Sequence, residues 1–150
     1  MPRPPELDAK LCADFPLLYS ARCADTRHTL DHVGLETGDG WCAIIYELSA
    51  ELERLIGKLP PEERNNYYAV QVKEKFGLLN FYMSKATEGM RSLICEAEGK
   101  SASTCEECRQ QGKLRGECWL KTLCDVRAAQ RRLLGGEPVS RRLNVALKDF

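Results

Sequence analysis

The stretch GDGWCAIIYELSAELERLIGKL, residues 38–59, decides the fold. Its apolar residues recur at the i, i+3, i+4 and i+7 spacing of an amphipathic helix. The stripe consists of Trp41, Ile44, Ile45, Leu48, Leu52, Leu55, Ile56 and Leu59. Asp39 predicts an N-cap, because its carboxylate can accept from the first free N–H groups of a helix. Pro60 and Pro61 predict the end. The sequence therefore predicts one long helix over about residues 40–59.

A β-hairpin is predicted after this helix, in YYAVQVKEKFGLLNFYMS, residues 67–84. Apolar and polar residues alternate there with the period of a strand, and Phe76-Gly77 stands where a turn is needed. Since an isolated hairpin is marginally stable, we expect a third strand from residues 17–24 or 32–38. The helix stripe should pack against four apolar positions of the hairpin. These are Val70, Val72, Leu79 and Phe81.

Shorter elements complete the predicted fold. Helices are expected over residues 6–14 and 87–101, and a third should begin near Thr122. The apolar side of that last helix would hold Leu123, Val126, Leu133 and Leu134. The fold class is thus α+β: a long amphipathic helix on a small antiparallel sheet, with a C-terminal cysteine knuckle and a terminal helix. We expect an α+β core at residues 1–102, the knuckle and its helix at 103–136, and a C-terminal tail at 137–150.

Composition narrows the functional class. The chain has 150 residues, of which 43% are hydrophobic and 29% charged, and its formal net charge is +0. These values are ordinary for a globular protein and exclude wholesale disorder and a polybasic nucleic-acid coat. The sequence contains no run of 18 apolar residues that could form a membrane span. The stretch MPRPPELDAK at the start lacks the apolar core of a signal peptide. We therefore expect a cytoplasmic protein with no membrane partner.

The eight cysteines carry the clearest chemical signal. In a reducing cytosol, metal binding or inert burial explains cysteines better than disulfides do. Cys105 and Cys108 form a CxxC pair that can hold one zinc ion, and Cys124 follows at a spacing usual for zinc ribbons. Cys118 is the candidate fourth ligand. The alternatives are a redox pair, which normally opens a helix in a βαβ unit, and four reduced cysteines without metal.

Several motifs in one order resemble a family of small phage, prophage and bacterial proteins. They are FPLLY (15–19), GDGW (38–41), VKEKFG (72–77), FYMS (81–84), TCEEC (104–108) and WLKTLCD (119–125). Family members carry CxxCG and later CxxH, so the resemblance implies a zinc knuckle with a histidine as its fourth ligand. Here Arg109 stands at the glycine position and Arg127 at the histidine position. Arginine cannot ligate zinc, so either Cys118 replaces the histidine or the metal is lost.

The resemblance also implies an accessory protein that occupies a host protein, including defence machinery. A basic group near the C-terminus, with apolar residues beside it, is the predicted partner-binding segment. It comprises Arg127, Arg131, Arg132, Arg141, Arg142, Leu143, Leu147 and Phe150. Acidic residues interleave with these arginines, so only weak nucleic-acid binding is expected from this segment.

Three functional hypotheses follow. The first is a non-catalytic protein that binds a host protein and inhibits a defence system. The alternative is a small zinc-ribbon regulator that binds nucleic acid, because Trp119 near the arginines could stack on bases. The third is a cysteine- or metal-dependent enzyme. No phosphate-binding glycine motif is present and no base is placed beside a cysteine nucleophile, so we predict that the chain is not an enzyme.

Overall fold

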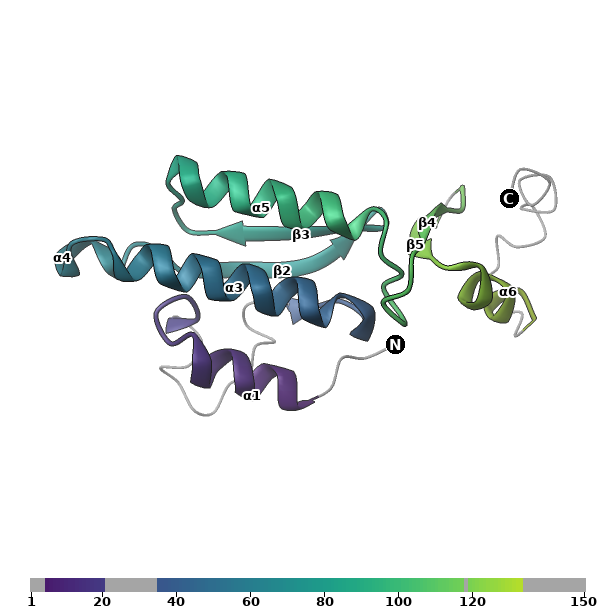
Figure 1. Ribbon diagram of the computed structural model, residues 1–150, viewed down its shortest axis with the longest axis horizontal. Helices are drawn as coiled ribbons and strands as arrows, with labels where there is room; N and C mark the ends of the chain where they lie inside the picture. Colours follow the sequence, from purple (N-terminus) through teal and green to yellow (C-terminus); the bar gives the residue numbers. More distant parts are fainter. Residues whose placement is uncertain (1–4, 21–34, 118, 134–150) are drawn as a thin grey trace.

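The computed structural model describes residues 5–20, 35–117 and 119–133. The chain forms helices and two small sheets, and the α+β fold class is confirmed (Figure 1). In order, the elements are α1 (Pro5–Asp14), β1 (Leu35–Glu36), the 3-10 helix η1 (Asp39–Trp41), α3 (Cys42–Gly57), α4 (Pro61–Arg64), β2 (Ala69–Lys75), β3 (Leu78–Met83), α5 (Glu88–Ser101), β4 (Lys113–Arg115), β5 (Lys121–Leu123) and α6 (Asp125–Leu133). Among the described residues, no helix is both long enough and apolar enough to cross a membrane.

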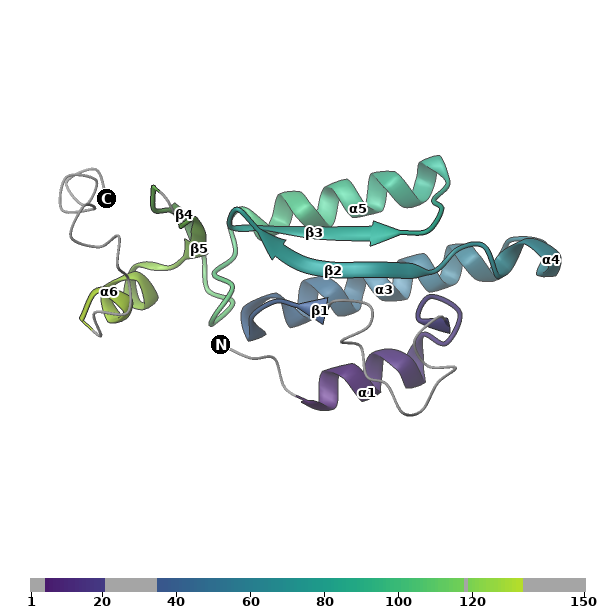
Figure 2. The same cartoon turned by 180° about the vertical axis from the view of Figure 1, so that it is seen from behind.

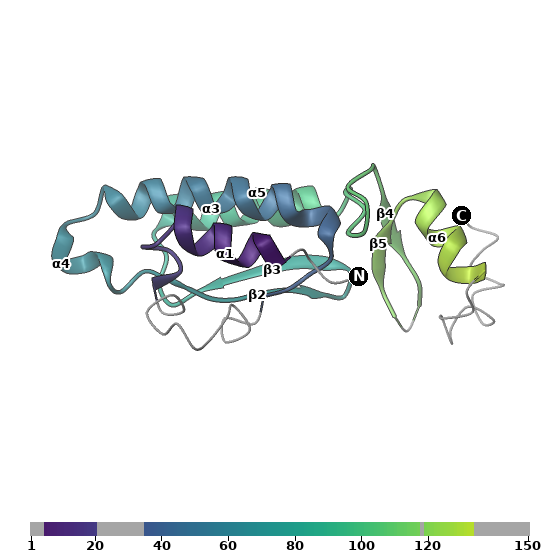
Figure 3. The ribbon, with the colours of Figure 1, turned by 90° about the horizontal axis from the view of Figure 1, so that it is seen from below.

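The first sheet has the order β1-β2-β3, with β2 and β3 antiparallel. The expected third strand is β1, within the predicted 32–38 range, but it pairs with β2 in parallel, so the sheet is mixed. Figure 2 shows β1 beside β2. Helices α3 and α5 lie side by side on one face of the sheet, and α1 flanks α3 (Figure 3).

The core forms between the α3 stripe and this sheet, as predicted. On the helix side, the fully buried or nearly buried members are Trp41, Ile45, Leu48, Leu52 and Ile56. Val72, Leu79 and Phe81 meet them from the sheet. The prediction for Val70 is wrong, since this side chain is 45% exposed. A register shift between Ala69 and Gln71 turns Val70 outward, and Ala69 takes the inward position.

Strand β3 is an edge strand whose free backbone groups are covered by helix α5. Ser101 Oγ accepts from the Leu79 N–H at 2.9 Å, and Glu98 Oε2 accepts from the Phe81 N–H at 3.0 Å. An uncovered edge would offer these N–H groups to another chain. Polar side chains on the inner side of α5 therefore close the sheet.

Two helix boundaries differ from the prediction. Asp39 does not cap the long helix: it lies inside η1, and neither η1 nor α3 has a side-chain cap. The predicted terminal helix begins at Asp125 rather than near Thr122. Leu123 belongs instead to β5, which pairs with β4 in a short antiparallel hairpin that the sequence patterns did not indicate. Three-residue strands are too short to show a period of two.

Replacing Leu52 by alanine tests the core. Leu52 is fully buried in α3, so we expect Leu52→Ala to lower the free energy of unfolding by about 2–5 kcal/mol, measured by denaturant titration. The matched control is Glu47→Ala on the exposed side of the same helix, which should change it by about 0.5 kcal/mol or less. Equal effects of the two substitutions would contradict this packing.

Candidate metal centre

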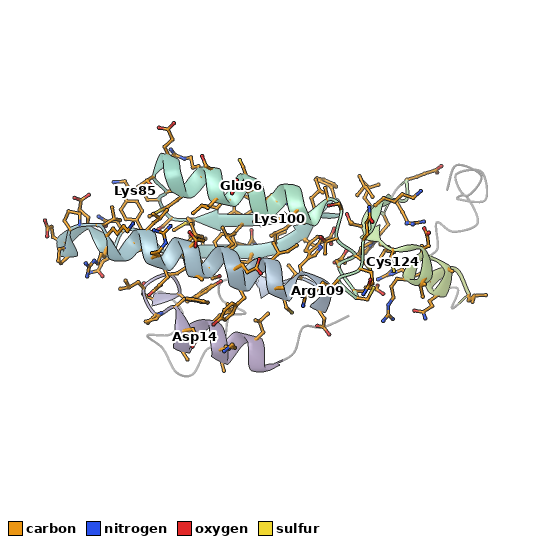
Figure 4. The ribbon with its side chains drawn as sticks, viewed as in Figure 1. Asp14, Lys85, Glu96, Lys100, Arg109 and Cys124 are labelled. Atoms are coloured by element: carbon orange, nitrogen blue, oxygen red, sulfur yellow. The ribbon has the colours of Figure 1, made fainter. Side chains whose placement is uncertain are left out.

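Three of the four predicted metal ligands come together in the structure. The sulfur atoms of Cys105, Cys108 and Cys124 lie within 4.8 Å of one another, and those of Cys108 and Cys124 are 3.5 Å apart. Cys105 and Cys108 sit in the turn between α5 and β4, and Cys124 directly follows β5 (Figure 4). This arrangement could hold a metal ion. Cys118 lies outside the described residues.

The backbone of the CxxC turn explains the placement of the first two sulfurs. The Arg109 N–H donates to the Cys105 carbonyl at 2.9 Å, and the Cys105 N–H donates to the Gln110 carbonyl at 2.7 Å. These bonds close a tight turn that requires a positive φ of 74° at Arg109. Glycine adopts that region freely, whereas a residue with a Cβ is strained there. Arg109, where the sequence resemblance led us to expect glycine, thus adopts a left-handed conformation.

The thiols of the cluster differ in acidity. Burial raises the pKa of Cys105. Burial would also raise the pKa of Cys108, but the backbone N–H of Gln110 and the side chains of Cys124, Cys105 and Arg127 outweigh it and lower this pKa. A thiolate is the form that binds metal, so the contacts that lower the pKa of Cys108 favour its metal-binding form.

Arg127, at the resembled family's histidine position, faces the sulfurs without being a ligand. Its backbone N–H donates to Cys124 Sγ at 3.4 Å, and its guanidinium donates to Gln130 Oε1 at 3.0 Å. A hydrogen bond to Cys108 raises the pKa of Arg127. Hydrogen bonds of this kind orient and stabilise metal-bound thiolates. Arg127 therefore belongs to the metal cluster as a positive neighbour.

The other predicted site residues divide into two groups. Arg131 is described and pairs with Glu107 at 2.7 Å, inside the knuckle rather than free for a partner. The side chain of Arg132 and residues 141, 142, 143, 147 and 150 lie outside the described part. Among the remaining cysteines, Cys12 is disulfide-bonded, which corrects the expectation of metal binding or inert burial in place of disulfides, while Cys95 is an exposed free thiol.

The GDGW motif is the residue set whose role the sequence patterns missed. The Gly40 N–H donates to the Glu106 carbonyl at 2.7 Å, and Trp41 Nε1 donates to the Thr104 carbonyl at 2.8 Å. A Cβ on Gly40 would lie 2.0 Å from the Cys105 carbonyl oxygen, and one on Gly38 would lie 2.4 Å from that of Glu106. The start of the long helix is therefore docked directly on the CxxC turn.

The tip of the β2-β3 hairpin forms a second contact with the knuckle. Thr122 Oγ1 donates to the Gly77 carbonyl at 2.6 Å, and the Thr122 carbonyl accepts from the Glu106 N–H at 3.0 Å. Close by, Lys121 Nζ lies 3.2 Å from a carboxylate oxygen of Glu74 and 3.2 Å from one of Glu106. Burial raises the pKa of Glu106, and the charge of Lys121 opposes that rise.

Comparisons of this chain with protein-family models, with curated proteins and with solved structures give no match. The residues of the knuckle and of its surroundings therefore carry the functional inference.

Adding one methyl group at Gly40 tests the docking of the knuckle. Its Cβ would overlap backbone atoms of Cys105 and Glu106, which cannot rotate away, so Gly40→Ala should lower the melting temperature strongly. The matched control is Gly99→Ala, because a Cβ there meets nothing within 4 Å in the last turn of α5. That control should raise stability by about 0.5–1 kcal/mol. A harmless Gly40→Ala would show that the contact is not required.

Proposed function

We propose that the chain is a non-catalytic binding protein of the host cytoplasm that occupies a host protein, and that a structural zinc ion holds its knuckle. Zinc is supported by the donor set: three thiols on one tight turn and one strand end are the ligand type of structural zinc sites. Cys118, as a fourth thiolate, would complete a tetrahedral site. The knuckle would then serve as a rigid base for the contact surface.

The exposed apolar side of α6 is the observation that carries the binding proposal. Val126 is 63% exposed and Leu133 is 86% exposed, although both are large aliphatic side chains. With the half-buried Ala129, they follow the i, i+3, i+7 spacing of one helix side. Ala128, in contrast, is buried in the cluster that contains Cys105 and Cys124. The helix therefore uses another side for its own knuckle and leaves this stripe to a partner.

The location of the stripe fits the partner segment predicted from the sequence. In the sequence, α6 is followed after three residues by residues 137–150, where Leu143, Leu147 and Phe150 are the predicted apolar anchors. Interfaces depend on a few large apolar anchors surrounded by polar residues, and α6 supplies such a rim with Arg127 and Gln130. The resemblance to phage and prophage accessory proteins supports a host protein as the partner, with a defence component as the specific hypothesis.

The zinc proposal predicts about one zinc ion per chain in protein purified without chelator, measured by elemental analysis. Cys105→Ser, Cys108→Ser and Cys124→Ser should each lose most of that zinc. Cys95→Ser is the matched control, because Cys95 is an exposed free thiol on α5, and it should retain it. Loss of zinc in Cys118→Ser would identify the fourth ligand, and retention would assign that position to another group. Wild-type protein without zinc would refute the proposal.

The binding proposal is tested by capture of host proteins from a nuclease-treated bacterial lysate, followed by mass spectrometry. The double variant Val126→Asp/Leu133→Lys keeps the net charge, and each new charge stands at the helix end that favours it. We expect it to lose a partner that wild type retains, with an unchanged far-UV spectrum. Truncation after Gly136 tests the predicted tail in the same way.

Val70→Asp is the control for this experiment, because Val70 is an exposed aliphatic residue far from α6 in the sequence. It should capture the same partner as wild type. Equal capture by wild type and the α6 variant would exclude the α6 stripe as the interface.

A further inference from the structure

Phe76 at the tip of the β2-β3 hairpin combines backbone strain with exposure. Its φ is 56° and that of Gly77 is 82°, so the turn has positive φ at both central residues. Asparagine, aspartate or glycine is usual at the first position, and a bulky side chain there is strained. Burial does not offset this strain, because Phe76 is 68% exposed. Folding of the chain alone does not explain the aromatic ring at this position.

Leu114 contacts the same tip, and Trp119 is the sequence neighbour of Leu120, whose backbone also lies against it. A Cβ on Gly77 would lie 2.3 Å from Leu114 Cδ1 and 3.2 Å from the backbone nitrogen of Lys121. The β4-β5 hairpin therefore packs against the turn. Leu114 is nevertheless 44% exposed, and Trp119, two residues before Lys121, is 59% exposed. Together, Phe76, Leu114 and Trp119 are named here the tip platform.

Three acidic side chains near the tip platform pair with cations and turn inward. Glu74 and Glu106 face Lys121, and Glu107 faces Arg131. Lys75 is exposed, and its Nζ lies 5.8 Å from the centre of the Phe76 ring. Arg109 is also exposed on the knuckle.

Two acidic residues of this region do point outward. Asp125 is paired with Arg115, and Glu117 is exposed in the β4-β5 turn. Four of the five acidic side chains named here therefore pair with a cation, and Lys75 is exposed beside the Phe76 ring.

We propose that the tip platform binds single-stranded nucleic acid, an activity separate from the protein binding proposed above. Exposed aromatic rings offer stacking surfaces to unpaired bases, and nearby cations attract the phosphate backbone. Phe76 and Trp119 would each stack one base, and Lys75 would contact a phosphate. The inward pairing of the acids favours this polyanion, because it removes most of the carboxylates that would repel it. Phe76, Leu114 and Lys75 do not belong to the C-terminal basic group predicted from the sequence.

Titration of the full-length protein against fluorescein-labelled oligo(dT) and oligo(U) of about 15 nucleotides tests the proposal, with anisotropy as the first measurement. Tryptophan fluorescence is the second. The chain has two tryptophans, of which Trp41 is fully buried, so quenching by the oligonucleotide reports on Trp119. We expect salt-dependent binding with quenching. Phe76→Asn should weaken it roughly 5- to 150-fold, since one stacked base contributes about 1–3 kcal/mol.

The asparagine variant separates folding from binding. Asparagine tolerates the left-handed conformation, so Phe76→Asn should be at least as stable as wild type while it binds less. Tyr82→Ser is the control, because Tyr82 is an aromatic residue of β3 that is 41% exposed and lies outside the platform. It should keep the affinity within about twofold, as surface positions outside an interface do.

Three results would overturn the proposal. The first is no anisotropy change and no quenching at about 50 mM salt, where non-specific contacts are already visible. The second is equal binding of duplex DNA and single strands, which would leave only general attraction to phosphate. The third is loss of a captured host protein in Phe76→Asn without any oligonucleotide binding by wild type, which would make the platform a protein interface.

Discussion

The hydrogen bond from the Gly40 N–H to the Glu106 carbonyl, 2.7 Å long, is the constraint on which the rest of the structure depends. It joins the start of the long helix to the CxxC turn through backbone atoms alone. Backbones approach this closely only where no Cβ intervenes, which requires glycine at position 40. The bond also explains the missing N-cap, since the knuckle, and not Asp39, satisfies an N–H group at the start of the helix. The position of the long helix and the position of the knuckle therefore depend on each other.

A group of three charged side chains favours one orientation of the knuckle at this backbone contact. It consists of Glu74, Lys121 and Glu106. Their exposed fractions are 20%, 17% and 4%, so desolvation cancels much of the attraction between the charges. A group of this kind contributes little net stability, but it disfavours other placements of the knuckle, in which a buried carboxylate would lose its cation. Each residue comes from a different segment: β2, β5 and the CxxC turn. The group thus fixes how three segments meet at one end of the sheet.

Sequence periodicity could predict the body of this fold and could not predict its contacts with the knuckle. The α3 stripe and the Phe76-Gly77 turn could be predicted, because a helical period and a turn each depend on residues that are close together in the sequence. Three features could not be predicted in this way. The outward turn of Val70 depends on a register shift, and the two strands of the β4-β5 hairpin are only three residues each. The glycines of GDGW contact backbone atoms more than sixty residues away in the sequence. Likewise, the ligand spacing identified Cys105, Cys108 and Cys124, whereas the facing position of Arg127 required the fold of the loop between them.

The small size of the knuckle core indicates that docking on the sheet, and the proposed metal ion, stabilise it. Its buried cluster in the described chain consists of Cys105, Leu123, Cys124 and Ala128. Ordering each residue of such a segment costs about 1–2 kcal/mol of backbone entropy, which four buried side chains cannot offset. The contacts with Gly40 and Gly77 supply part of the missing stabilisation, and the proposed zinc ion would supply the rest, since zinc binding contributes about 10–16 kcal/mol in small zinc modules. Cys124 stands between β5 and α6, so an ion bound there would fix both the strand that supports the tip platform and the helix that carries the exposed stripe. One structural ion would in this way hold two separate contact surfaces in place.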